Sequence, residues 1–171
     1  MIGRSTRPPS KRTDRKGTPQ RPSPYREGLL LKGTPLLNPL TPAGIRTRRE
    51  GLGLSRRELA QILDVAEASI RSWETGKTEP FDPIVTHMAI GGLEDDFLNL
   101  IDDLTDPADG DKPETGEPLQ LRSYLRQDDY ETLEPYWSKL LPLPTYRMAV
   151  AQAALILQAS DIPTYIVGVE D

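Results

Sequence analysis

Few side chains in this 171-residue sequence stand at the spacings that catalysis requires. Gly76, Lys77 and Thr78 have the order that ends a phosphate-binding loop, but the first glycine of that motif would fall at Arg71. The only histidine, His87, has no second histidine and no cysteine to share a metal ion with, because the chain contains neither. We therefore expect no catalytic residue, no cofactor and no metal site, and we do not expect an enzyme.

Two acidic stretches also indicate solvated surface. TDPADGDKPETGEP at 105–118 lacks the D-x-[DN]-x-[DN]-G register of a calcium loop and has the composition of a linker. The run LEDDFLNLIDDL at 93–104 places four aspartates on the solvent-facing side of one predicted helix.

The stretch 52–76, LGLSRRELAQILDVAEASIRSWETG, predicts two short helices joined by a tight turn. Ser55 and Glu58 have the spacing of a capping box, in which each side chain binds the other residue's amide. Leu59 and Leu63 then share one helix face at i, i+4 spacing. This pattern predicts a first helix that begins after Ser55 and packs its leucines inward.

The second helix has an inward face of its own. Ile70 and Trp73 stand at i, i+3 spacing, and Asp64 lies in the turn before them. Gly76 supplies the left-handed residue that commonly ends a helix, and Pro80 prevents the helix from resuming.

With these residues in place, Ile45 to Pro80 resembles the helix-turn-helix of the Cro/C1-type (XRE-like) repressor family. The strings GLS, ELA, V-x-x-x-S-I and W-E-x-G-K carry the resemblance over about a fifth of the chain. It implies a transcriptional regulator, typically a repressor, that holds helix 67–75 in the major groove of double-stranded DNA.

The resemblance also implies a role for each matching residue. The residues that would face base edges are Glu67, Ala68 and Ser72, and those that would meet phosphates are Arg56, Ser69, Arg71, Thr75 and Lys77. A structural ion pair falls on Arg49 and Glu74, beside the buried Trp73. Two departures from the family stand out: Asp64 replaces the usual glycine of the turn, and the acidic Glu67 would repel backbone phosphate.

The net charge of -5 is unevenly distributed along the chain. Residues 1–32 carry nine Lys or Arg against two acidic residues, whereas residues 81–171 carry five against eighteen. We interpret residues 1–40 as a disordered basic arm followed by an apolar connector, LLLKGTPLLNPL. The arm is either a solvated tail or a DNA-tracking segment that uses Arg4, Arg7, Lys11, Arg12, Arg15 and Lys16.

The remaining chain predicts a mainly α fold. Residues 41–104 form a five-helix DNA-binding domain that begins at the N-cap Thr41, with a fourth helix after Asp82 and a fifth at 93–104. The acidic linker 105–118 follows, and residues 119–171 form a small α+β domain. Its predicted elements are a strand at 119–125, a short helix before Pro135, a helix capped by Thr145, and a last strand in IPTYIVGV.

The helix after Thr145 is apolar on nearly all sides, and a domain of this size has too little protein to cover it. We therefore expect Met148, Ala151 and Leu155 to contribute to a homodimer. The pattern Y-R-x-x-x-x-x-A-A-L at 146–155 and LRSYL before it weakly resemble the C-terminal part of phage anti-CRISPR-associated repressors.

Three functions remain open. The first is a dimeric repressor of phage or bacterial origin that binds a palindromic operator, in the cytoplasm and associated with the nucleoid. The second is an antitoxin-like regulator whose C-terminal domain binds a co-encoded protein. The third is an RNA-binding regulator. No apolar run approaches the roughly 20 residues that span a bilayer, so we expect no membrane partner.

Overall fold

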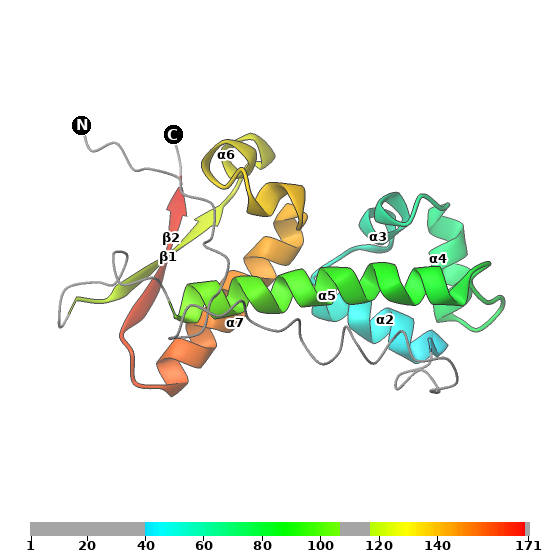
Figure 1. Ribbon diagram of the computed structural model, residues 1–171, viewed down its shortest axis with the longest axis horizontal. Helices are drawn as coiled ribbons and strands as arrows, with labels where there is room; N and C mark the ends of the chain where they lie inside the picture. Colours follow the sequence, from blue (N-terminus) through cyan, green and yellow to red (C-terminus); the bar gives the residue numbers. More distant parts are fainter. Residues whose placement is uncertain (1–39, 107–116, 170–171) are drawn as a thin grey trace, which may run out of the picture. The chain divides into compact units, whose positions relative to one another are not determined.

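The computed structural model describes residues 40–106 and 117–169, a mainly helical fold with a small sheet (Figure 1). The predicted basic arm and most of the predicted acidic linker lie outside the described residues. The elements, in chain order, are α2 (Pro42–Gly51), α3 (Arg56–Ile62), α4 (Glu67–Glu74), α5 (Pro83–Thr105), β1 (Leu119–Tyr124), α6 (Gln127–Leu133), the short 3-10 helix η1 (Trp137–Lys139), α7 (Leu143–Ala159) and β2 (Thr164–Val169).

Side chains satisfy the first amides of three helices at the positions that the sequence indicates. The Thr41 hydroxyl accepts a hydrogen bond from the Gly44 amide at 3.0 Å. Both bonds of the capping box at Ser55 are present, at 2.7 and 3.2 Å. The Asp82 carboxylate accepts from two amides at the start of α5. The predicted starts of α2, α3 and α5 are therefore confirmed.

A residue with left-handed backbone ends each of four helices. Gly53, Asp64, Gly76 and Asp161 have φ angles of 70°, 52°, 70° and 57°, and they follow α2, α3, α4 and α7. At each end the next amide bonds back across the turn, as Val65 N does to Ala60 O at 2.9 Å. These bonds satisfy carbonyls that the helix leaves without partners. Asp64 adopts the strained conformation that its position in the turn indicated.

The predicted fourth and fifth helices are one helix, so the expectation of five helices in residues 41–104 is wrong. α5 runs without a break through Gly91 and Gly92 for 23 residues. Each glycine costs a helix about 1 kcal/mol. Ile90, Leu93 and Phe97 are buried on one face of α5, on both sides of the glycine pair, and their burial outweighs that cost.

The last helix also begins earlier than the sequence suggested. α7 starts at Leu143, with Pro142 in the N-cap position and Pro144 in the first turn, where a missing amide hydrogen costs nothing. Thr145 is therefore not the cap. Its side chain is fully buried, and its hydroxyl has no hydrogen-bond partner among the described residues.

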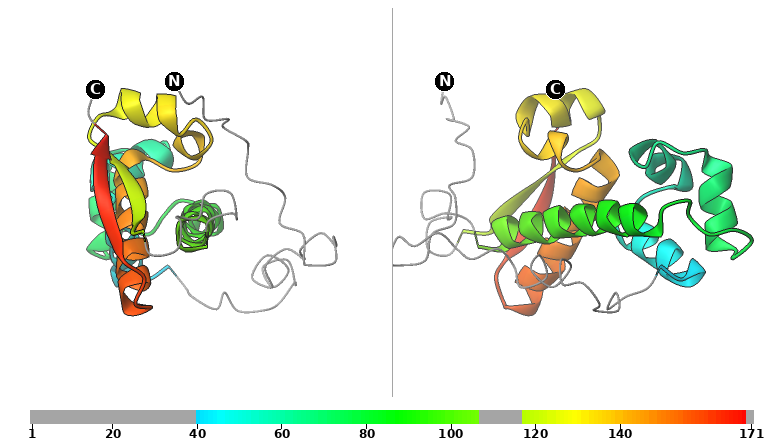
Figure 2. Two further views of the ribbon diagram at one scale, coloured as in Figure 1. Left: turned by 90° about the vertical axis from the view of Figure 1, so that its left-hand side faces the viewer. Right: turned by 45° about the vertical axis from the view of Figure 1, so that its right-hand side comes forward.

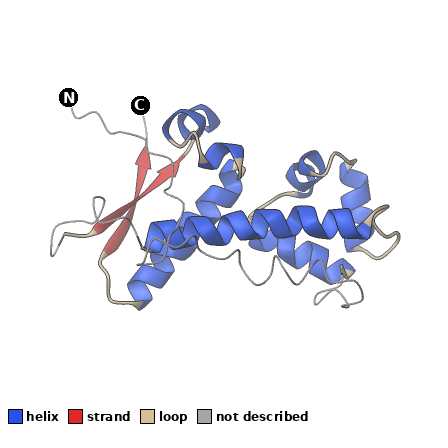
Figure 3. Cartoon of the chain, viewed as in Figure 1, coloured by secondary structure: helices blue, strands red, loops and turns tan. Residues whose placement is uncertain are grey.

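The two strands form a parallel pair, with Leu119 opposite Thr164 and Tyr124 opposite Val169. Parallel neighbours need a long crossover, and α6, η1 and α7 supply it. α7 contacts both strands and also packs along α5, so it lies between the sheet and α5 (Figures 2 and 3). The predicted strands and the α+β character of residues 119–169 are confirmed.

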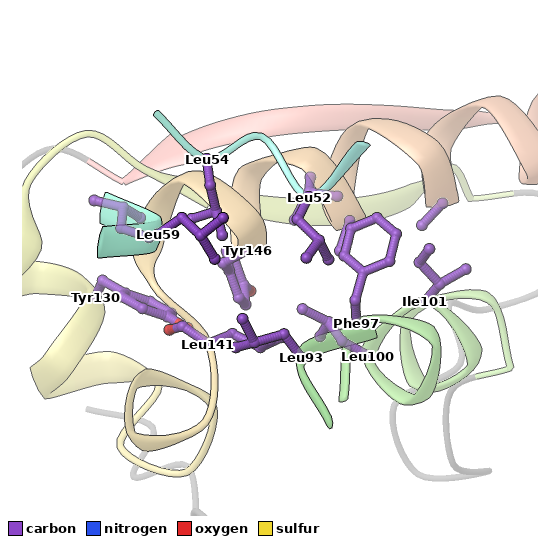
Figure 4. Close-up of a cluster of buried hydrophobic side chains, with 14 of the residues drawn as sticks. Leu52, Leu54, Leu59, Leu93, Phe97, Leu100, Ile101, Tyr130, Leu141 and Tyr146 are labelled. Carbon is purple, nitrogen blue, oxygen red and sulfur yellow. The ribbon is translucent and has the colours of Figure 1, made fainter. Parts of the chain in front are cut away.

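One hydrophobic core joins the helix-turn-helix to this α+β part. Leu52 and Leu54, from the turn between α2 and α3, lie beside Phe97 of α5 and Tyr146 of α7 (Figure 4). Tyr146 in turn contacts Tyr124 and Tyr130 with its ring tilted against theirs, and their ring centroids lie 5.6 and 4.8 Å from its own. The division into two separate domains stays a prediction, because residues 107–116 lie outside the described part of the chain.

Glycine is required at position 53, where the turn after α2 lies against the start of α7. A Cβ atom at Gly53 would lie 3.1 Å from Pro144 O and 3.4 Å from Met148 Cβ. The positive φ at this residue also disfavours any larger side chain. Because there is no side chain here, the backbones of the two segments can approach each other closely.

The ion pairs of Glu74 tie α2, α3 and α4 together. Its carboxylate accepts from Arg49 Nε at 2.6 Å and from Arg56 Nε at 2.7 Å, and its side chain is only 1% exposed. Arg49 also donates from Nη1 to Leu54 O at 2.6 Å. Burial alone raises the pKa of Glu74, but the hydrogen bonds from the two arginines outweigh it and hold the pKa below its ordinary value.

Replacing Gly53 with alanine should destabilise the fold by about 1 to 3 kcal/mol, since it adds both left-handed strain and a close contact. The matched control is Gly51→Ala in α2, because a Cβ there meets nothing within 4 Å. Urea unfolding of both variants measures the difference. Equal stabilities would contradict the close approach of this turn to α7.

Replacing Glu74 with alanine should cost about 3 to 5 kcal/mol, because Arg49 is left buried without its partner. Since folding lowers the pKa of Glu74, its contribution is complete above the unfolded pKa of about 4.3 and declines as the pH falls through the lower folded pKa. The stability gap between the wild type and Glu74→Gln should therefore narrow as the pH falls below about 4.3. Denaturant unfolding from pH 7 to pH 3 measures this gap, and a constant gap would contradict the assignment.

Candidate nucleic-acid interface

α4 presents one buried face and one exposed face. Ile70 is fully buried and Trp73 nearly so, and both face the core behind the helix. α3 and α2 both pack against α4, and the ion pairs of Glu74 fix the end of the helix to them. The opposite face carries short or polar side chains, and such a surface can approach a nucleic acid closely.

The three predicted base-reading residues differ in their exposure. Glu67 and Ala68 are exposed in the first turn of α4, whereas Ser72 is half-buried one turn later. The Ser72 hydroxyl accepts a hydrogen bond from Thr78 Oγ1 at 2.8 Å. Ser72 therefore already has a partner that fixes its orientation, and its own hydroxyl hydrogen remains to be donated.

Four of the predicted phosphate-binding residues lie on α4 or directly after it. Ser69 is half-buried, and Arg71 has a side chain that is 68% exposed. The Thr75 hydroxyl donates to the carbonyls of Arg71 and Ser72, so it can only accept from another group. Lys77 is exposed just beyond Gly76.

The acidic residue on this face has a cation near it. Arg71 Nη2 lies 3.9 Å from Glu67 Oε1, one helical turn away. A pair as exposed as this one contributes little to stability. It nevertheless keeps a positive charge beside the carboxylate, and this reduces the repulsion that Glu67 would exert on a phosphate.

Arg56 is brought to the same region but is engaged within the protein. Its Nε donates to Glu74, while the side chain as a whole remains 35% exposed. The ion pair uses Nε, so the guanidinium group is held in a fixed position near the start of α3. An arginine fixed in this way loses less side-chain entropy when it binds a phosphate.

The start of α4 has no side-chain cap. Ala66 occupies the N-cap position, and no side chain accepts a hydrogen bond from the first amides. Uncapped amides at a helix start carry a partial positive charge that suits an anion. The Ser69 amide itself donates to Ala66 O at 2.9 Å, and the phosphate contact of Ser69 that the resemblance implied stays a prediction.

Sequence reasoning missed two side-chain contacts, one at α4 and one between α2 and α5. One is the bond from Thr78 to Ser72, which depends on the reversal of the chain at Gly76. The other ties α2 to α5, where Arg48 binds both oxygens of Glu94 at 2.6 and 2.7 Å. Arg48 Nη1 also lies 3.2 Å from Nδ1 of His87, and burial together with this cation lowers the histidine pKa.

Other kinds of site find no support in residues 40–106 and 117–169. No group of three or more His, Asp or Glu side chains in these ranges is arranged to hold a metal ion. No helix in the same ranges is long and apolar enough to cross a membrane.

Comparisons with known proteins bear on the segment that contains α3 and α4. A search of curated proteins finds no match to the chain. The helix-turn-helix family model matches residues 45–80, about a fifth of the sequence. This segment contains α3, α4 and both partners of the ion pairs that Arg49 and Glu74 make. The likeness of residues 119–171 to anti-CRISPR-associated repressors stays a prediction. Residues 45–80 thus match the helix-turn-helix family of Cro/C1 type, and this match supports a DNA-binding regulator.

Proposed function

We propose that the protein is a sequence-specific repressor that binds a palindromic operator as a homodimer, with α4 in the major groove. The exposed face of α4 carries this proposal, because Glu67 and Ala68 stand free of the core in the first turn of the helix. Glutamate can accept a hydrogen bond from cytosine N4, and the alanine methyl group can contact the methyl group of thymine. We further propose a phage or bacterial origin.

A homodimer suits this reading face because α4 is short. Its eight residues reach only a few base pairs, and a second copy multiplies a weak single contact. Among the residues expected at the dimer contact, Ala151 and Leu155 are exposed. Met148 is half-buried and packs against the protein's own core near Gly53. Leu155 is therefore a better candidate for contact with a partner than Met148.

Selection of bound sequences from a random DNA library tests the proposal directly. We expect a palindrome with half-site centres about ten base pairs apart, because the two recognition helices must meet the same side of the duplex. Enrichment of structured RNA over duplex DNA in a competition assay, or no enriched sequence at all, would contradict the proposal.

Two single substitutions on α4 should separate base reading from phosphate binding. Ser72→Ala removes a hydroxyl from the reading face, and it should change base preference at one position of the half-site. Arg71→Ala removes an exposed cation, and it should weaken binding to all sequences alike and reduce the salt slope by about one. Binding to a panel of single-base operator variants at several salt concentrations measures both effects. The opposite assignment of effects would contradict this docking of α4.

A further inference from the structure

β2 has an edge that no described element covers. The sheet has two strands, β1 pairs with one side of β2, and no third strand lies beside it in the described residues. Figure 2 shows β2 at the outer side of the pair. A two-stranded sheet is only marginally stable in water, and parallel strands are normally buried inside larger sheets. The edge of β2 is therefore an unusual surface to leave open.

The register of the two strands determines which backbone groups of β2 face outward. The Leu119 amide donates to Pro163 O at 2.8 Å, so the backbone groups of Pro163 point toward β1. Successive residues of a strand direct these groups to alternate edges. The N–H and C=O groups of Thr164, Ile166 and Gly168 therefore point away from β1.

The side chains of β2 lack the features that usually protect an edge strand. The sequence TYIVGV contains no charged residue and no proline, although lysine and proline are the common means of preventing edge-to-edge pairing. Tyr165 and Ile166 are 44% and 48% exposed. Two copies of this strand can approach each other without repulsion between like charges.

β1 differs from β2 in this respect. Its exposed positions include Arg122, and the Arg147 side chain donates to Tyr124 O and Leu125 O at 2.7 and 2.6 Å, at the end of the strand. The Tyr124 carbonyl lies on the edge of β1 that faces away from β2, so the bond from Arg147 occupies a backbone acceptor that a further strand would need. β2 is therefore the edge that remains available for pairing.

We propose that β2 pairs with β2 of a second copy, antiparallel about a two-fold axis at Ile166, to form a continuous sheet in the order β1, β2, β2 of the partner, β1 of the partner. Residues with outward-facing backbone groups form hydrogen-bonded pairs in such a ladder. Ile166 then faces its own counterpart, and Thr164 pairs with Gly168. A two-fold contact of this kind is self-complementary and closes at two copies.

Exposed apolar residues on α7 and in the turn before β2 support the same contact. Leu155 and Ile156 on α7 and Ile162 in the turn before β2 are 66%, 46% and 41% exposed. α7 packs on the strands, so pairing through β2 brings the two α7 helices together on one side of the joined sheet. This contact would explain why α7 is apolar beyond the face that the protein's own core covers.

The inference rests on the homodimer in the proposed function, and cross-linking tests its geometry. The chain has no cysteine, so Ile166→Cys introduces a single thiol. In a hydrogen-bonded antiparallel pair the two Cα atoms lie about 5.5 Å apart, a spacing that a disulfide accepts. Mild oxidation should convert most of this variant to a covalent dimer. The control is Met88→Cys, at an apolar residue of α5 that is 57% exposed and away from β2, and it should remain largely uncross-linked.

Light scattering at micromolar concentration supplies the second measurement. Ile166→Lys should lower the mass to that of a monomer and weaken operator binding at least tenfold, while Met88→Lys should remain a dimer. Circular dichroism checks that each variant is folded, and the conservative cysteine variant stands in if the lysine variant is not. A dimer that persists in Ile166→Lys and an uncross-linked Ile166→Cys would overturn pairing through β2 and leave the dimeric repressor intact. A monomeric wild type would overturn both.

Discussion

The carboxylate of Glu74 imposes the constraint on which the helix-turn-helix depends. A buried negative charge is tolerated only when cations and hydrogen-bond donors surround it, so Arg49 from α2 and Arg56 from α3 must remain at 2.6 and 2.7 Å from it. Each helix is thereby held in place relative to the end of α4. The outward face of α4 has a defined orientation because its inner end cannot move without separating these charges.

Features that depend on neighbouring residues could be predicted from the sequence. The capping box at Ser55, the N-cap at Thr41 and the left-handed residue at Gly76 each involve residues within four positions of one another. The alternating pattern of 119–124 similarly identified β1. In these cases local hydrogen bonds and the period of the apolar residues determine the structure, and both can be read directly from the letters.

Features that depend on distant residues could not be predicted in the same way. The sequence predicted two helices, one after Asp82 and one at 93–104, but the burial of Ile90 and Phe97 against other parts of the fold keeps α5 continuous. Arg56 was assigned to a phosphate, and its partner Glu74 lies eighteen positions away. The need for glycine at position 53 became clear only with Pro144 beside it. Tertiary packing decided each of these cases over local preference.

The close approach at Gly53 brings the turn after α2 directly against the start of α7. Gly53 has no side chain to separate the two backbones, and its neighbours Leu52 and Leu54 are buried in the common core. Two copies joined through their C-terminal parts, as proposed, would therefore hold their two α4 helices at a fixed separation and a fixed angle. Inserting one base pair between half-sites rotates one of them by about 35° around the duplex. The affinity of such a dimer would therefore depend on the number of base pairs between the half-sites as well as on their sequence.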